Sequence, residues 1–231
     1  MKILANFQIS DSLAKTTGLD VIPLYPYKRL DEPVSAHADM LFAIIKDTIF
    51  CYKDYLDDYP ILKEAIASSN YRLSYADIAC AREYPQDIGL NVLVMGNHIF
   101  CNQEFTAGNL LEYAKGLNYK IVNVKQGYSA CSTLVLNDNT AITTDVGIKK
   151  AIEGVGKKAL LIPSDDIHLP PYSCGFIGGA SGKIGNAVYV FGNLDTLKHA
   201  DEIRAMIQAS GCTPFEIPLG RVYDFGGIKV I

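Results

Sequence analysis

The feature that most constrains the fold of this chain is a repeat of apolar hairpins. AIIKDTIFCY (43–52) and VLVMGNHIFCN (92–102) each contain an apolar strand, a two-residue turn and a second strand ending in IFC. The turns, Lys-Asp at 46–47 and Gly-Asn at 96–97, are built from residues that suit tight hairpins. Two further hairpins are TLVLNDNTAITTD (133–145), with its turn at 137–139, and AVYVFGNLDTL (187–197), with its turn at 192–193.

Each hairpin is followed by a stretch with apolar residues at helical spacing, and then by a third strand. The expected helices are 58–69, 109–118, 147–156 and 197–211. The expected third strands are 71–76, 119–124, 158–165 and 213–220. The N-terminal segment contains the same parts: a strand at 1–7, a helix at 10–17 with Ser10 as its N-cap, and a strand at 20–26.

The C-terminal strand GGIKVI (226–231) completes this N-terminal unit. We therefore predict one α/β domain over 1–231, a five-bladed propeller of ββαβ repeats whose last blade is closed by both termini. Such closure leaves few free strand edges. The alternative is an ordinary α/β domain with coincidental hairpins, which explains five aligned units less well. The blades are predicted at about 38–76, 90–124, 131–165, 183–220, and 224–231 together with 1–26.

The composition narrows the class of protein. The 231 residues are 49% hydrophobic and 20% charged, which is enough to bury a core. A net charge of −4 without a basic run argues against nucleic acid as a partner. No apolar run approaches the roughly 18 residues of a membrane span, and the N-terminus lacks a signal-peptide pattern. Six cysteines without a CxxC pair indicate free thiols in a reducing, cytoplasmic compartment.

Five such units resemble the pentein fold, the five-bladed α/β propeller. Arginine deiminases, dimethylarginine dimethylaminohydrolases, amidinotransferases, agmatine deiminases and the archaeal-eukaryotic ribosome anti-association factor share this fold. GYSACSTL (127–134) and GFIGGASGK (175–183) are also similar to a small bacterial family of the fold. The resemblance implies a narrow central channel lined by the first strand of each blade. The enzymes of the fold act there on guanidino carbons through a cysteine, a histidine and acidic residues.

Residues at the starts of the first strands would then converge at the channel mouth. The longest loop, 164–182, would reach the same face, and long loops in compact domains often carry function. The converging set is His37, Asp39, Asp87, Asn91, Cys131, Ser132, Lys183, Asn186 and Asp224, with His168 and Cys174 from the long loop.

The resemblance implies a role for several of these side chains. Cys131 would attack the guanidino carbon, with its pKa lowered by Lys183 or by protonated His37. His37 would move protons, and Asp39 and Asp224 would pair with the guanidinium group. Each side chain also has a purely structural alternative, such as packing of Cys131 at a strand start. We predict Cys131, His37 and Asp39 as catalytic residues, and Asp224, Lys183, Asn186, Ser132 and His168 as substrate-binding residues.

One departure from the enzymes of the fold leaves two functions open. Those enzymes usually carry the nucleophilic cysteine in the last blade, which here reads YDFGGIKVI. We expect either a cysteine-dependent hydrolase or transferase acting on a small guanidino or amidino compound, or an inactive pentein that binds a small polar ligand or a macromolecule. No cofactor is expected, since GGASGK (178–183) lacks the spacing of a phosphate-binding loop.

A metal site is a weaker alternative. Its ligands would be drawn from His37, Asp39, Cys131 and His168. No two of these show the close spacing that is usual for metal ligands.

Overall fold

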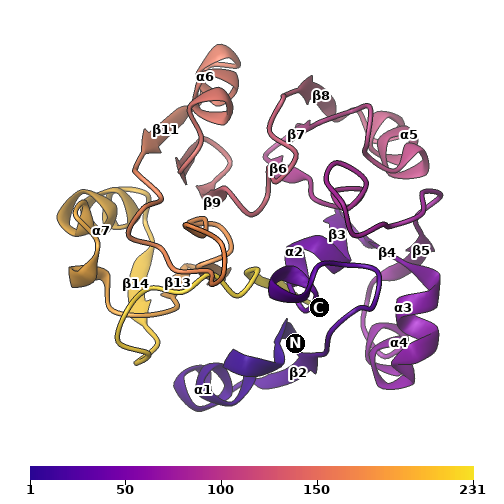
Figure 1. Ribbon diagram of the computed structural model, residues 1–231. Helices are drawn as coiled ribbons and strands as arrows, with labels where there is room; N and C mark the ends of the chain where they lie inside the picture. Colours follow the sequence, from indigo (N-terminus) through magenta and orange to yellow (C-terminus); the bar gives the residue numbers. More distant parts are fainter.

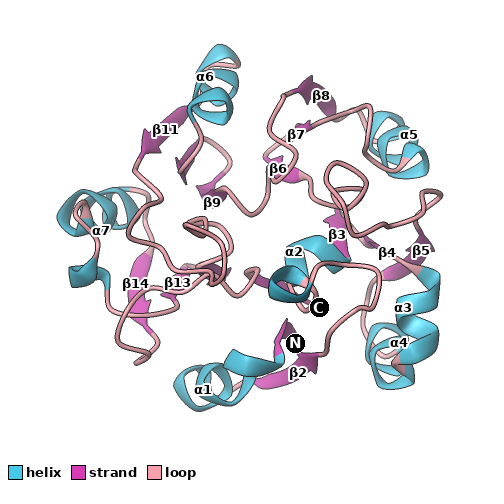
Figure 2. Cartoon of the chain, in the orientation of Figure 1, coloured by secondary structure: helices cyan, strands magenta, loops and turns pink.

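A computed structural model describes all residues, 1–231, and shows five three-stranded sheets arranged in a ring (Figure 1). Every sheet combines a pair of antiparallel strands with a third strand that runs parallel to the middle strand. Most helices lie on the outside of the ring, and α2 (Ala38–Leu41) lies near its centre (Figure 2). The predicted five-bladed α/β propeller is therefore confirmed.

Four blades are continuous in sequence. The first contains β3 (Phe42–Ile45), β4 (Thr48–Cys51), α3 (Lys53–Asp58), α4 (Pro60–Ala67) and β5 (Arg72–Tyr75). The second contains β6 (Leu93–Met95), β7 (His98–Cys101), α5 (Gly108–Gly116) and β8 (Lys120–Asn123). The third contains β9 (Thr133–Asn137), β10 (Thr140–Thr143), α6 (Val146–Gly154) and β11 (Lys158–Leu161). The fourth contains β12 (Ser181–Ile184), β13 (Ala187–Val190), α7 (Ala200–Ala209) and β14 (Thr213–Glu216).

The fifth blade joins the two ends of the chain, as predicted. Its middle strand β1 (Lys2–Asn6) pairs antiparallel with β15 (Ile228–Val230) and parallel with β2 (Asp20–Leu24). The helix α1 (Phe7–Thr17) connects β1 to β2. The backbones of Lys2 and Ile231 exchange two hydrogen bonds, of 2.7 and 2.8 Å, which close the ring.

The middle strands explain the continuous apolar runs seen in the sequence. β4 and β7 are buried along their whole length, because each has a strand on both sides and a covering helix. The largest cluster of buried apolar side chains spans the first two blades and contains 31 residues. None of the helices combines the length and the apolar character needed to cross a membrane.

The fourth hairpin differs from the prediction. Its turn lies at Gly185-Asn186 and not at 192–193, so the first strand is the glycine-containing SGKI of β12. Gly185 has a φ of +58°, which suits the tight turn. Gly182 fits in β12 because the side chain of Ile228 occupies the space that a Cβ atom would need. Ile228 lies elsewhere in the sequence, so the local pattern does not predict this strand.

The helices also differ from the prediction. α1 begins at Phe7, and the Asn6 side chain caps it by accepting a 3.0 Å hydrogen bond from the Gln8 amide. The predicted N-cap, Ser10, lies inside the helix, where its hydroxyl donates to the Asn6 carbonyl. The unpredicted short helix α2 (Ala38–Leu41) carries Asp39 to the centre of the ring (Figure 1).

Candidate active site

The segments that enter the first strands meet at the centre of the ring. His37 and Asp39 come from the start of α2, Cys131 from the turn before β9, and Asp224 from the segment before β15. All four are buried, with 1% to 4% of their surface exposed. The structure therefore brings together the three predicted catalytic residues and one predicted substrate-binding residue.

Glycines allow these segments to approach one another. Gly226 has a φ of +78°, and a Cβ atom on it would lie 2.1 Å from the Cβ atom of His37. A Cβ atom on Gly178 would lie 2.2 Å from the carbonyl oxygen of Ala130. Since no side chain fits at either place, these glycines set the distance between the blades at the site.

A cavity of about 270 Å³ opens above these residues. Cys131, His37 and Asp224 line it together. This volume lies near the lower end of the range for small-molecule sites. Its walls are mainly aromatic and aliphatic and include Val34, Tyr128, Leu169, Tyr172, Cys174 and Phe176.

Asn91 connects the parts of the site. Its Nδ2 group donates to the Cys131 Sγ atom at 2.9 Å and to the Asp39 carbonyl oxygen at 3.2 Å. Its Oδ1 atom accepts from the Ala130 amide at 2.8 Å. Asn91 is thus in the converging set expected from sequence, in a role that the sequence did not indicate.

The carboxylate of Asp224 is fixed by the backbone. Oδ2 accepts a 2.8 Å hydrogen bond from the Phe176 amide, and Oδ1 accepts a 2.9 Å bond from the Gly226 amide. The His37 Nδ1 atom lies 3.7 Å from Asp224 Oδ1. Neither ring nitrogen of His37 and neither carboxylate oxygen of Asp39 has a hydrogen-bond partner. Buried polar atoms without partners are rare in proteins.

Burial dominates the electrostatics of the site. It raises the pKa of Asp224 to about 8, with a further contribution from Asp39. It raises the pKa of Asp39 to about 6, although Lys229 opposes the shift. It lowers the pKa of His37 to about 3. Burial and the two carboxylates also hold the pKa of the Cys131 thiol well above its usual value. The site therefore contains a neutral imidazole, a protonated thiol and two carboxyl groups, Asp39 and Asp224, that release their protons less readily than usual.

Lys229 is a cation whose charge acts on Asp39 and Cys131. It lies on β15, and burial lowers the pKa of its ammonium group while Asp39 and Cys131 oppose that shift. The cation predicted beside Cys131 was Lys183 or protonated His37, but Lys183 lines a different cavity of the channel, and burial lowers the pKa of His37. A charged residue between Ile228 and Val230 was the sequence signal for Lys229.

The comparisons with known proteins agree with this architecture. A family of unknown function, DUF6873, matches residues 4–229. The chain belongs to this family. No curated protein matches the chain by sequence.

Solved structures similar to this DUF6873 protein are penteins, which confirms the predicted fold family. One is a dimethylarginine dimethylaminohydrolase from Pseudomonas aeruginosa, solved as a cysteine-to-serine mutant complexed with citrulline. It has a TM-score of 0.58 and 11% sequence identity, and the match covers 94% of this chain and 91% of the hydrolase chain. A C. jejuni agmatine deiminase with bound substrate has a TM-score of 0.59 at 10% identity, covering 97% and 91%. Inosamine-phosphate amidinotransferase from Streptomyces griseus has a TM-score of 0.55 at 13% identity, covering 95% and 75%.

Two predicted substrate-binding residues of this DUF6873 protein do not face the Cys131 cavity. Asn186 is exposed in the turn between β12 and β13, so its predicted position at the channel mouth is wrong. The error follows from the misplaced fourth hairpin. Ser132 is fully buried, and its hydroxyl donates to the Tyr128 carbonyl at 2.8 Å, so it holds the turn that presents Cys131.

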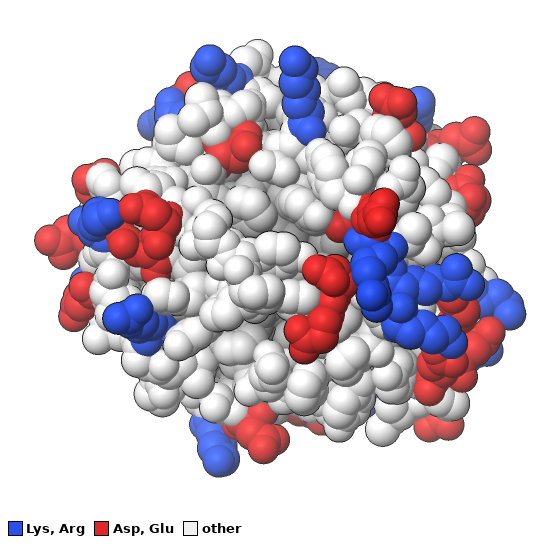
Figure 3. Space-filling view, in the orientation of Figure 1, with Lys and Arg blue, Asp and Glu red and all other residues white.

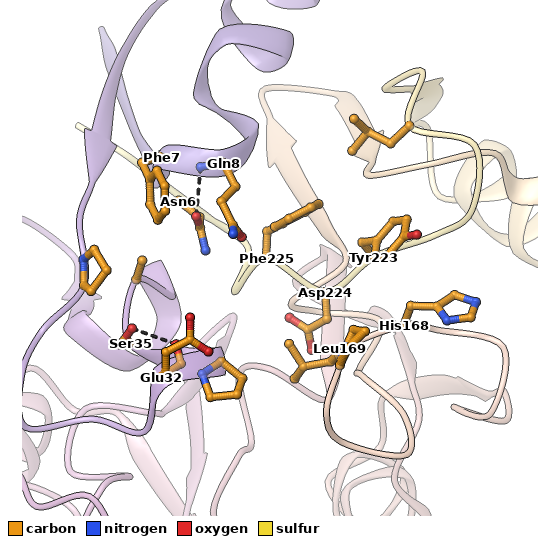
Figure 4. Close-up of a pocket in the computed structure, with 15 residues that line it drawn as sticks. Asn6, Phe7, Gln8, Glu32, Ser35, His168, Leu169, Tyr223, Asp224 and Phe225 are labelled. Carbon is orange, nitrogen blue, oxygen red and sulfur yellow. Dashed lines mark hydrogen bonds between the residues drawn. The ribbon is translucent and has the colours of Figure 1, made fainter.

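His168 supports the site through its backbone. Its amide donates to the Val222 carbonyl, and its carbonyl accepts from the Asp224 amide at 2.9 Å. Its ring packs against Tyr223, and Figure 4 shows it turned away from the Asp224 carboxylate. The predicted contact of the His168 ring with a substrate beside Cys131 therefore does not fit this arrangement.

A second pocket reaches Asp224 from the side of the fifth blade. It has a volume of about 450 Å³ and is lined by residues of α1, of the segment around Glu32 and of the His168 loop (Figure 4). On the face seen in Figure 3, most charged side chains lie toward the edge, and uncharged residues form most of the area over the ring centre. No group of three or more His, Cys, Asp or Glu side chains is arranged to hold a metal ion.

Proposed function

We propose that this protein is a cysteine-dependent hydrolase or transferase that acts on a small guanidino or amidino compound in the Cys131 cavity. The observation that carries the proposal is that a thiol, an imidazole and a carboxylate line one small, mostly apolar cavity. The similar structures named above are a dimethylaminohydrolase, an agmatine deiminase and an amidinotransferase.

The charge balance of the site favours a cationic ligand. Asp39 and Asp224 are buried carboxyl groups with raised pKa values, and the neutral His37 offers them no positive charge. A planar guanidinium group in the Cys131 cavity would supply a cation beside Asp224, and the charge of Asp39, which acts on both Asp224 and Cys131, would favour that cation as well. The rings of Tyr128 and Phe176, with centroids 6.2 Å apart, would cover its apolar part.

The same cation would activate the nucleophile. A guanidinium beside Cys131 lowers the pKa of the thiol, since opposite charge favours the thiolate. The Asn91 Nδ2 group, 2.9 Å from Sγ, stabilises the thiolate as well. The thiol therefore becomes reactive only when the substrate is present.

The reaction then proceeds in two steps. His37 takes the thiol proton, Sγ bonds to the amidino carbon, and the bond from that carbon to the leaving amine breaks as His37 returns the proton to the amine. Water next adds to the same carbon and gives a proton to His37, the carbon–sulfur bond breaks to release a ureido product, and His37 returns the proton to the Cys131 thiolate. In a transferase, an acceptor amine replaces the water. Asp224, 3.7 Å from His37, stabilises the imidazolium that forms in each step.

Product release from L-arginine, agmatine and smaller guanidines tests the proposal. We expect ammonia and a matching ureido product with one of these compounds, and a loss of at least about 10³-fold in Cys131→Ser. Cys212→Ser is the matched control, because Cys212 is also buried but lies in the fourth blade, where its thiol donates to the Leu136 carbonyl of β9 and lines no part of the Cys131 cavity. Turnover that persists in Cys131→Ser would contradict the mechanism.

The second candidate function is binding without catalysis. The raised pKa of Cys131 and the lack of a cysteine in the last blade favour it. Alkylation by 2-chloroacetamidine and by its neutral isostere 2-chloroacetamide separates the two functions. For each thiol, the measured quantity is the rate of alkylation by 2-chloroacetamidine divided by the rate with 2-chloroacetamide. For an enzyme, this ratio should be at least about tenfold larger for Cys131 than for free cysteine, which corresponds to a lowering of the thiol pKa by about one unit. Slow labelling by both reagents, with guanidines stabilising the protein but releasing no product, would support a binder.

A further inference from the structure

A further cavity, called the channel cavity below, lies in the channel, separate from the Cys131 cavity and from the pocket beside the fifth blade. Its volume is about 240 Å³, and all five first strands of the blades contribute to its wall. Asp39 lines this cavity but not the Cys131 cavity, so its carboxyl group lies between the two. The proposed reaction uses only the Cys131 side.

Two lysine side chains enter the channel cavity. Lys183 from β12 and Lys229 from β15 both line it, and neither makes a hydrogen bond or an ion pair in the protein. Several surface lysines, in contrast, pair with carboxylates, as Lys198 does with Asp165 at 2.7 Å. Asp39 is the single acidic residue of the wall, so positive charge exceeds negative charge inside the channel.

The rest of the wall offers little to balance these ammonium groups. The Ser181 hydroxyl donates to the Ile177 carbonyl, and the Thr133 hydroxyl pairs with that of Thr143 at 3.0 Å. Much of the remaining surface is aliphatic or is glycine backbone. Two like charges in a confined, weakly polar channel repel each other, and a bound anion would remove that cost.

We propose that this channel cavity binds a small oxyanion, a carboxylate or a phosphate, between Lys183 and Lys229. The volume is large enough for either anion. This anion site goes beyond the proposed function, because it uses another cavity and binds an anion instead of a cationic guanidino or amidino compound. It would remain if the Cys131 cavity proved to be inactive.

Inorganic phosphate and acetate, each compared with chloride at equal ionic strength, test this site without any substrate. We expect a saturable rise in melting temperature and a heat of binding with phosphate or with acetate, and no saturable effect of chloride. Tighter binding of phosphate would identify the ligand class as phosphate, and binding of acetate at least as tight would identify it as carboxylate. The absence of a saturable response to both anions would overturn the proposal.

Variants place the site in the channel. Lys183→Gln should weaken anion binding by about tenfold or more, since it removes one charged donor. Lys183→Arg should retain binding, which separates a charge effect from a loss of structure. Lys158→Gln is the control, because Lys158 is exposed on β11 and outside the cavity. Equal affinities in the wild type and Lys183→Gln would show that the anion binds elsewhere.

Discussion

Asp224 combines two backbone hydrogen bonds with a raised pKa. The amides of Phe176 and Gly226 favour its ionised form, yet burial and the nearby Asp39 outweigh them and raise the pKa to about 8. The folded protein therefore binds a proton at Asp224 more tightly than the unfolded chain does, which is opposite to the usual behaviour of a paired carboxylate.

This difference predicts how stability depends on pH. Between the unfolded value near 3.8 and the folded value near 8, ionisation of Asp224 lowers the free energy of unfolding as pH rises. His37, with a folded pKa of about 3 against 6.5, acts in the opposite direction only below pH 6.5. From pH 6.5 to 8, the contribution of Asp224 to stability should therefore fall, by at most about 1.4 kcal/mol per pH unit for its one proton.

Asp224→Asn tests the assignment by urea denaturation across this range. The variant should be less stable overall, by about 1–3 kcal/mol, because its amide group cannot accept both backbone hydrogen bonds. Its stability should, however, change less between pH 6.5 and 8 than that of the wild type. Asp11→Asn, at an exposed position of α1, should keep the wild-type profile, and an unchanged profile in Asp224→Asn would refute the assignment.

Those site residues could be predicted whose place at the centre follows from their position in the chain alone. Cys131, His37, Asp39 and Asp224 precede first strands, so the blade repeat places them at the centre. The partners of these residues depend on side-chain direction across blades, which a repeat does not contain. For this reason Lys229 was missed, and no role could be given to Asn91.

At the scale of elements, glycine conformation fixes how closely the blades meet. Gly226→Ala should destabilise the protein by roughly 3 kcal/mol or more, because the new methyl group would overlap the Cβ atom of His37 in a backbone conformation that disfavours alanine. The overlap should also displace His37 from the site.

Gly18→Ala provides the matched control. Gly18 has a similar φ of +69° at the end of α1, but nothing lies within 4 Å of the new atom. It should cost about 1–2 kcal/mol, from backbone conformation alone. Equal losses in the two variants, measured by urea denaturation, would show that contact with His37 is unimportant.

Most elements could be predicted because their signals are local. Three hairpins have tight turns between apolar strands, and each is followed by a helical apolar pattern. β12 could not be predicted in the same way, because SGKI is stabilised as a strand by β13 and by the Ile228 side chain over Gly182. α2 has only four residues, too few for a periodic pattern.

At the scale of the whole molecule, the fifth blade closes the ring through the contacts of β15 with β1. Deleting residues 228–231 should abolish cooperative unfolding, because it removes the three residue pairs of β15 with β1 and the two backbone bonds between Lys2 and Ile231. Circular dichroism during urea titration would show the loss. A cooperative transition with wild-type midpoint would contradict this role of β15.

A circular permutant is the control for the deletion. A short glycine linker would join 231 to 1, and new ends would open at the exposed turn of 185–186. The fourth blade would then be the one closed by both termini. Its stability should stay within about 2 kcal/mol of the wild type, since exposed turns tolerate new ends.

The closing strand also sets an order of events when the chain is made. Synthesis delivers Cys131 long before residues 224–230, so a growing chain has the thiol without Asp224, Gly226 or Lys229. During that interval β1 lacks its antiparallel partner, and Cys131 lacks the carboxylate, the glycine contact and the ammonium group of the finished centre. Completion of the ring and assembly of the candidate site are thus a single event, and an unfinished chain contains only part of that site.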